Sequence, residues 1–165
     1  MIKRTLISCC LLLSFSLTSL GQELTTFILV RHAEKAKDDD RNPSLSDVGI
    51  ARAEKLNKML STMEISAIYS TPYKRTRLTV SPIAEAKGLE VTDYDFRNNE
   101  LLTSLMEKHK GGTILISGHS NTTPVLVNKL LGEEKFAWLK EDEYDKVFIV
   151  TLSALGEGKL ALLSY

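Results

Sequence analysis

Two unbroken apolar runs constrain the fold of this chain more than any other feature. Residues 26–30 read TFILV and residues 113–117 read TILIS, with no alternation of apolar and polar positions. A strand with one solvated face alternates, so a continuous run of this length is typical of a strand covered on both faces. Such strands occur mainly in parallel sheets flanked by helices, and the two runs therefore predict an α/β fold.

The rest of the chain alternates between short strands and longer helices. Ser46 is expected to cap a helix whose apolar stripe contains Ala53 and Leu56, and Gly88 suits the end of a second helix. Further strands are predicted at 65–69, 89–92, 147–152 and 160–163, and the other helices at 73–87, from 98 or 99 to 110, and at 122–131. At 165 residues one domain is expected. The pattern predicts a three-layer α/β/α domain over residues 22–165, with a mostly parallel central sheet.

The first 21 residues have the pattern of an export signal. Lys3 and Arg4 precede an apolar stretch over residues 5–20, which ends in small residues before Gly21. This order is typical of a secretory signal peptide, so residues 1–21 are expected to be removed by cleavage near Gly21. A membrane anchor needs roughly 20 strongly apolar residues, and hydroxyl residues dilute this run. Acylation at Cys9 is a weaker alternative, because little of the apolar run precedes that cysteine.

Cleavage there would leave a chain with ordinary charge and no thiols. Both cysteines, Cys9 and Cys10, lie in the expected signal. In the full sequence, the basic residues Lys and Arg number 21 and the acidic residues Asp and Glu also number 21. This balance argues against nucleic acid as a partner. A second long apolar run is missing from the sequence, so no stable membrane association is expected after cleavage. The expected location is the periplasm or the exterior of the cell.

Histidines directly follow both unbroken strands. The first strand runs into Arg31 and His32, and the second into Gly118 and His119. In an open parallel sheet, ligands bind outside the carboxyl ends of the strands, so both imidazoles are expected in one crevice. The helix that begins at Asn121 adds backbone N–H groups that favour an anion, and Asn121 is therefore expected to help bind phosphate.

A third strand end supplies a further cation. Residues 69–76 read YSTPYKRT, which places a strand end, a tight turn and the first turn of a helix together, with Arg75 in that turn. Arg31 and Arg75 beside two imidazoles describe a pocket for a dianion, and a phosphoryl group fits it because guanidinium groups bind oxyanions bidentately. Without a carboxylate ligand set the pair of histidines suits an oxyanion better than a cation, so no metal and no cofactor are expected.

Three motifs together resemble the histidine phosphatase superfamily, the phosphoglycerate-mutase-like group with an RHG-type motif. They are RHAEK at 31–35, YSTPYKRTRLT at 69–79 and GHSNT at 118–122, in the order that the family has. The short chain is similar to the small bacterial branch that includes phosphohistidine phosphatases. The resemblance implies a phosphatase that acts on a small phosphorylated substrate through a phosphohistidine intermediate, with no metal.

The resemblance also implies roles for individual residues. His32 would be the nucleophile, Arg31 and Arg75 would clamp the phosphoryl oxygens, and His119 would stabilise the group in transfer. Ala33 departs from the glycine that many members have there. Many members also carry a glutamate as proton donor, and this chain has no clean equivalent. Asp95 lies closest in register, and Glu34 and Glu100 are the other candidates.

Other interpretations of these motifs remain open at the level of sequence. GHSNT nearly spells the nucleophile elbow of a serine hydrolase, which would use Ser120, but no histidine follows Ser120 in the chain. A module that binds phosphate without catalysis is the main alternative from another class. Asp38 and Asp40 mimic the start of a calcium loop, but Pro43 and Gly49 stand at its sixth and twelfth positions.

Three further aromatic or basic residues are expected to have structural rather than catalytic roles. Phe136 and Trp138 are expected to pack a short helix under the sheet, and His109 is expected at the surface near a helix end. Selectivity for a substrate is expected to come from the loops at 35–43 and 94–99.

Overall fold

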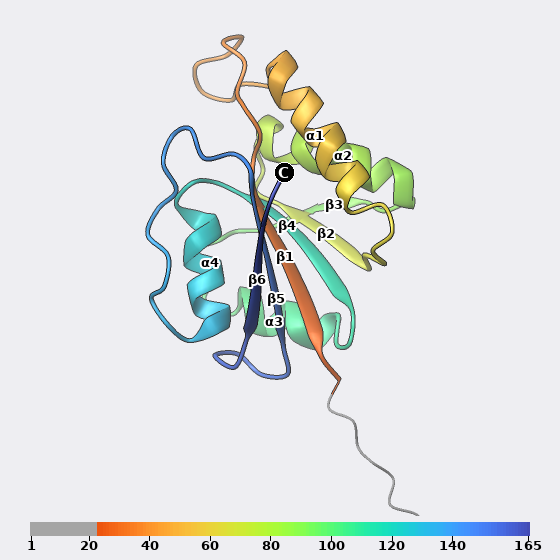
Figure 1. The fold of residues 1–165 in the computed structure, drawn as a ribbon, viewed down its shortest axis with the longest axis vertical. Coiled ribbons are helices and arrows are strands. Elements are labelled where there is room, and N and C mark those ends of the chain that lie inside the picture. The colour runs from red at the N-terminus through yellow and green to blue at the C-terminus, as the bar shows by residue number, and fades with distance from the viewer. Residues whose placement is uncertain (1–22) are drawn as a thin grey trace, which may run out of the picture.

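The computed structural model describes residues 23–165, which form one six-stranded sheet with helices on both faces (Figure 1). The expected signal peptide, residues 1–21, lies outside the described residues. The strands are β1 (Thr25–Arg31), β2 (Ala67–Ser70), β3 (Val91–Asp93), β4 (Thr113–Gly118), β5 (Lys146–Leu152) and β6 (Lys159–Ser164). Their order is β3-β2-β4-β1-β5-β6; the first four are parallel, and β5 and β6 each run antiparallel to the preceding strand. The mostly parallel sheet is confirmed.

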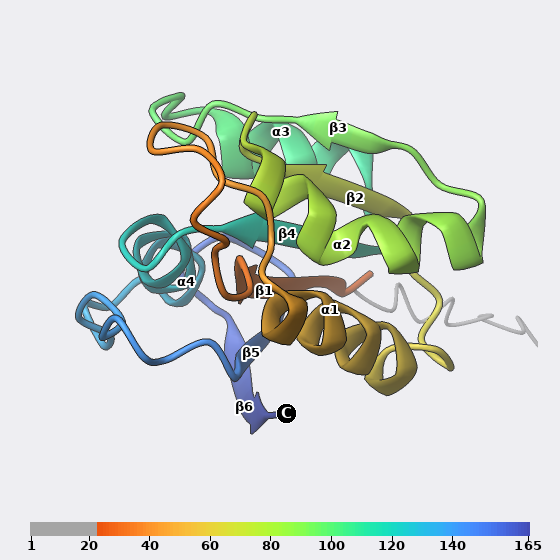
Figure 2. The ribbon, with the colours of Figure 1, turned by 90° about the horizontal axis from the view of Figure 1, so that it is seen from above.

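The helices form the two outer layers of the domain (Figure 2). Helices α1 (Asp47–Met59) and α2 (Lys74–Lys87) pack on one face, and α3 (Leu101–Lys108) and α4 (Thr122–Leu131) pack on the other. Successive residues of β1 enter opposite layers: Ile28 packs with α1 and α2, whereas Phe27 and Leu29 pack with α3 and α4. Both faces of β1 are therefore apolar, and the three-layer α/β/α architecture is confirmed. None of the helices in this part of the chain is long and apolar enough to cross a membrane.

The predicted helix ends at Ser46 and Gly88 are confirmed. The Ser46 hydroxyl accepts a hydrogen bond from the Gly49 backbone N–H at 3.2 Å, and Gly88 ends α2 with φ 64°. Gly49 also permits a close approach, because a Cβ atom there would lie 2.3 Å from the carbonyl oxygen of Glu34. The start of α1 thus packs directly against the segment that follows β1.

Several element boundaries differ from the sequence prediction. Strands β2 and β3 begin two residues later than expected, and α3 begins at Leu101 rather than at residue 98 or 99. The Asn98 side-chain oxygen accepts a hydrogen bond from the Glu100 N–H at 3.0 Å, and the Asn98 N–H donates to the Asp95 carbonyl at 3.1 Å. These local bonds form a turn that delays the start of the helix.

Residues 133–145 contain neither helix nor strand, so the short helix expected around Phe136 and Trp138 is wrong. The Asn128 side-chain oxygen accepts hydrogen bonds from the backbone N–H groups of Lys135 and Phe136, at 3.2 and 2.9 Å. A tertiary contact therefore takes the donors that a helix would use. Phe136 does pack inward, with its ring 5.1 Å from that of Phe148, but Trp138 is 71% exposed.

Candidate active site

A cavity of about 880 Å³ opens at the carboxyl ends of β1, β2 and β4. The strand register pairs Arg31 with Gly118 and Ser70 with Ser117, so the residues that follow these strands lie at one level of the sheet. The cavity wall contains the five residues expected to bind phosphate or act in catalysis, namely Arg31, His32, Arg75, His119 and Asn121. The structure therefore brings together residues from three separate segments of the chain.

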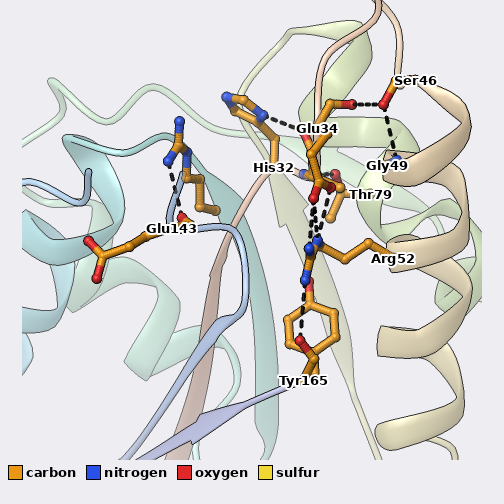
Figure 3. Close-up of polar contacts among 10 residues, drawn as sticks. His32, Glu34, Ser46, Gly49, Arg52, Thr79, Glu143 and Tyr165 are labelled. Carbon is orange, nitrogen blue, oxygen red and sulfur yellow. Dashed lines mark hydrogen bonds and ion pairs between the residues drawn. The ribbon is translucent and has the colours of Figure 1, made fainter. Parts of the chain in front are cut away.

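The imidazole of His32 is buried and held in one tautomer. Its side chain is 4% exposed, and its Nδ1 lies 2.8 Å from the carbonyl oxygen of Ala33 (Figure 3). Because a carbonyl oxygen only accepts, Nδ1 carries the ring proton and Nε2 carries the lone pair. Burial lowers the pKa of His32 to about 3, which outweighs the opposing hydrogen bond to Ala33. At neutral pH His32 is therefore neutral, with an unprotonated Nε2.

A chain of hydroxyl groups fixes the second imidazole. The Nε2 atom of His119 lies 2.8 Å from the Thr71 hydroxyl, which donates in turn to the Thr76 hydroxyl at 3.1 Å. Since Thr71 uses its proton on Thr76, His119 Nε2 is the donor to Thr71, and His119 Nδ1 carries the lone pair. The guanidinium of Arg75 lies 3.5 Å from that Nδ1 and can only donate to it.

The electrostatic surroundings keep His119 neutral as well. Burial lowers its pKa to about 4, and the positive charges of Arg75 and Arg31 add to the effect. The rings of His119 and His32 approach edge to face, with centroids 5.4 Å apart. Two neutral imidazoles thus lie next to each other among fixed cations.

Arg31 is anchored by the irregular segment at residues 133–145. Its side chain is 3% exposed, and its Nη1 donates to the carbonyl oxygens of Lys140 at 2.6 Å and Glu143 at 3.1 Å. The Tyr144 ring lies against the guanidinium, 4.1 Å from centroid to Cζ. These contacts hold the arginine at the cavity wall, while its buried Nε has no hydrogen-bond partner among the described residues.

Arg75 contributes a second cation to the cavity wall. It lies in the first turn of α2 as predicted, and its Nε is also buried without a partner in the described part of the chain. Burial lowers the pKa of its guanidinium, which remains charged. Arg31 also pairs with Glu141, with Nη2 3.6 Å from Oε2. Each arginine nevertheless keeps one buried N–H without an acceptor among the described residues, which indicates a site for an anion because buried polar groups otherwise find partners.

The start of α4 closes the same side of the site. Asn121 caps this helix with its side-chain oxygen, which accepts from the Thr122 N–H at 2.9 Å. A Cβ atom at Gly118 would lie 2.8 Å from the Thr122 hydroxyl and 2.9 Å from that of Thr123, so glycine permits the tight turn into the helix. Ser120 lines the cavity. Among the described residues, no histidine is hydrogen-bonded to Ser120 as a general base would be.

The three candidate proton donors occupy different surroundings. Glu34 forms a pair with Arg52, with Oε1 2.7 Å from Nη2, and Figure 3 shows its side chain directed toward Arg52, away from the His32 imidazole. Burial would raise the pKa of Glu34, but the hydrogen bonds from Arg52 prevail and lower it. Neither Glu34 nor Glu100 lines the cavity. Asp95 does, as an exposed carboxylate whose pKa is lowered by hydrogen bonds from Arg97.

Sequence analysis did not identify several residues of this site. Thr71 and Thr76 form the hydroxyl chain behind His119, Tyr144 covers Arg31, and Trp138 lines the cavity. The only local signal was that Thr71 lies inside the YSTPYKRT motif. Within residues 23–165, the structure contains no group of three His, Cys, Asp or Glu side chains placed to hold a metal ion.

Sequence comparison supports the assignment made from the motifs. The profile of the histidine phosphatase superfamily (branch 1) matches residues 27–96. Phosphoserine phosphatase 1 of Hydrogenobacter thermophilus is 37% identical over 100 residues, a match that covers 52% of this chain. The match covers 47% of that relative, so the chain spans about half of its length.

Solved structures of phosphatases share the fold. A mycobacterial glucosyl-3-phosphoglycerate phosphatase has a TM-score of 0.70 at 13% identity, covering 86% of this chain and 98% of that one. The protein histidine phosphatase SixA, solved with tungstate, has a TM-score of 0.69 at 19% identity, covering 84% of this chain and 96% of the other. Residues 27–96 thus match the model of the histidine phosphatase superfamily, and the chain shares the fold of these phosphatases.

Proposed function

We propose that this protein hydrolyses phosphate monoesters through a phosphohistidine on His32, without metal or cofactor. One observation carries the proposal. The neutral, buried imidazole of His32 presents an unprotonated Nε2 in a cavity where two arginines, Arg31 and Arg75, each keep a buried Nε without a partner among the described residues. A phosphoryl dianion would satisfy both arginines and place phosphorus beside a nucleophile.

In the first step the lone pair of His32 Nε2 attacks phosphorus, and the bond from phosphorus to the ester oxygen breaks. The hydrogen bond from Nδ1 to the Ala33 carbonyl stabilises the positive charge that the ring acquires. Arg31 and Arg75 bind the equatorial oxygens, over which the loose transition state spreads its charge. A bound phosphoryl dianion raises the pKa of the neighbouring His119 and favours a proton on its Nδ1. We assign the resulting imidazolium the role of holding the transferring group.

The leaving alkoxide needs one proton, and we assign its donation to the carboxyl group of Asp95. Of the three candidates it is the one that lines the cavity. Arg97 keeps Asp95 ionised in the free protein, but a dianionic substrate nearby raises a carboxyl pKa by repulsion and favours proton uptake. In the second step water attacks phosphorus, its proton returns to Asp95, and the bond from phosphorus to Nε2 breaks.

The names of similar proteins support a small phosphorylated substrate. One relative is named as a phosphoserine phosphatase and one structural neighbour as a glucosyl-3-phosphoglycerate phosphatase. Both names describe enzymes that remove phosphate from small molecules.

Turnover of simple phosphate monoesters by the purified protein tests this function. We expect release of inorganic phosphate that is unchanged after treatment with EDTA. Activity lost on chelation and restored by zinc or magnesium would contradict the mechanism. Tight binding of phosphate with no turnover of any ester would instead favour the non-catalytic binding module.

We also propose that residues 1–21 direct export to the periplasm or the exterior, on the sequence pattern alone. N-terminal sequencing of the exported protein is expected to begin near Gln22. A product that retains Met1, or that carries an acyl group at Cys9, would contradict this proposal.

A further inference from the structure

Exposed aromatic side chains gather at the cavity rather than over the surface. Within residues 23–165, the aromatic side chains that are more than a third exposed are Tyr73 at 39%, Phe96 at 43% and Trp138 at 71%. All three line the cavity that contains His32. Aromatic rings are usually buried, and a group of them left exposed around a cavity marks a binding surface. We call these three residues the aromatic rim.

Backbone contacts hold the segments that carry the rim. The N–H of Leu139, next to Trp138, donates to the Ser120 carbonyl at 2.9 Å. On the other side, the Tyr94 N–H donates to the Ser70 carbonyl at 2.9 Å, and the turn from Asp95 to Asn98 encloses Phe96. The exposure of these rings is therefore built into the fold, because both segments are tied to the ends of β2 and β4.

The rim begins directly beside the groups that would bind the phosphoryl oxygens. The Tyr73 ring lies 4.5 Å from Cζ of Arg75 and 5.1 Å from the His119 ring, centroid to centroid. Phe96 and Trp138 have no aromatic or cationic partner of this kind in the described part of the chain. Their ring faces are thus available to a ligand whose phosphate is held by Arg31 and Arg75.

The charges near Phe96 are already compensated. Asp93 pairs with Arg77, and Asp95 pairs with Arg97. A ligand that reaches this wall meets the ring of Phe96 and two ion pairs. An uncharged ring on the ligand suits such a wall better than a second ionised group.

We propose that this protein selects phosphate monoesters whose alcohol carries an aromatic ring, and that the ring packs on the aromatic rim. The inference rests on the proposed function, since it assumes that Arg31 and Arg75 hold the phosphoryl group. It predicts a preference for an aryl-bearing alcohol over an aliphatic one of similar size and similar leaving-group basicity.

Binding of two phosphonates tests ring recognition without requiring turnover. The probes are 2-phenylethylphosphonate and 2-cyclohexylethylphosphonate, which share the charged group and the size of the substituent and differ in whether the ring is aromatic. Trp138 is the only tryptophan of the chain, so its fluorescence reports directly on the rim. We expect the phenyl compound to bind at least about fivefold more tightly, ~1 kcal/mol, and to change the emission of Trp138 at saturation. A difference of less than about fivefold would overturn the proposal.

Variants connect that preference to the rim. Phe96→Ala keeps the fluorescent reporter, and it is expected to reduce the difference in binding free energy between the two phosphonates by about half or more. Trp138→Ala removes the reporter, so calorimetry measures its binding, and we expect a reduction of the same size. Leu155→Ala is the matched control, because Leu155 is similarly exposed but lies outside the cavity. A preference that persists in both rim variants would place the ring elsewhere and overturn the proposal.

Hydrolysis of 2-phenylethyl phosphate and 2-cyclohexylethyl phosphate separates this proposal from the proposed function. Turnover of both esters with equal kcat/KM would contradict ring recognition and leave the phosphatase function intact. Selective phosphonate binding without turnover of either ester would contradict the phosphatase function and leave ring recognition intact. Selective turnover of the phenyl ester would support both.

Discussion

The cavity joins two regions that are built in opposite ways. The strand-end cluster, consisting of Arg31, His32, Thr71, Arg75 and His119, is largely buried and follows regular strands. The aromatic rim is exposed, and Phe96 and Trp138 lie on segments without helix or strand. Groups that perform chemistry need fixed geometry, which the sheet provides. Groups that select a ligand need only reach it, so irregular segments can carry them.

The largest loss of activity should come from the strand-end cluster, when His32 is removed. His32→Ala eliminates the nucleophile and is expected to lower kcat by at least about 10³-fold on every ester tested. His109→Ala is the matched control, because His109 bonds to the Tyr69 hydroxyl at 2.9 Å and lies outside the cavity. A His32→Ala protein that folds and keeps a tenth of its turnover would contradict the assignment of chemistry to the strand-end cluster.

Asp95 lies beside Phe96 of the rim and is expected to act in catalysis rather than in selection. Asp95→Asn removes the proposed proton donor and should lower kcat on an alkyl phosphate by about 10²-fold. The loss should shrink to less than about tenfold on 4-nitrophenyl phosphate, because a stable phenolate leaves without protonation. An equal loss on both substrates would remove Asp95 from the role of donor.

The burial of the two histidines also predicts a loss of stability in acid. The pKa of each is lowered in the folded protein, to about 3 for His32 and about 4 for His119. In the unfolded chain a histidine pKa is near 6.5, so below that pH the unfolded state binds more protons than the folded state. The free energy of unfolding should therefore decrease as the pH is lowered from about 6.5 to 4. Each histidine contributes up to ~1.4 kcal/mol per pH unit to this decrease.

Urea unfolding at a series of pH values measures this effect. The His32→Ala protein should lose the share of the slope that His32 contributes. His109→Ala should keep the shares of His32 and His119 and lose only that of His109, whose pKa is also lowered by burial. Identical slopes in the wild type and in His32→Ala would show that His32 is not buried in its neutral form.

The smallest effect is expected at Glu34, which lies close to His32 in sequence but outside the cavity. Glu34→Gln weakens the pair with Arg52 and should lower the free energy of unfolding by about 1 kcal/mol. Turnover should stay within about threefold of the wild type and show no dependence on the leaving group. A loss that grows with the basicity of the leaving group would return Glu34 to the role of proton donor.

The histidines of the strand-end cluster could be predicted from the sequence because the strands that precede them can occupy few positions in a fold. An unbroken apolar strand must be covered on both faces, and parallel strands place their carboxyl ends at one edge. His32 and His119 follow such strands, so their convergence needed no knowledge of the tertiary contacts. Thr71 was missed because a threonine hydroxyl has many local partners, and its bond to His119 depends on the packing of β2 beside β4.

The rim could not be predicted because long-range contacts set the path of its segments. The side chain of Asn128 binds the backbone of Phe136, and the Leu139 N–H binds the Ser120 carbonyl, so no local periodicity marks the position of Trp138. The direction of the Glu34 side chain also depends on the path of the chain. The chain turns after β1, and the carboxylate that follows His32 by two residues reaches α1 instead of the cavity.

Trapping of the covalent intermediate tests the central claim most directly, namely that His32 Nε2 receives the phosphoryl group. The wild-type protein is mixed with an ester carrying a labelled phosphate, quenched in denaturant at alkaline pH, and digested. We expect a phosphoryl group that is stable to base, labile to acid and carried by the peptide that contains His32, with no label in His32→Ala. An acid-stable label on the peptide that contains Ser120 would contradict the account and identify a serine nucleophile.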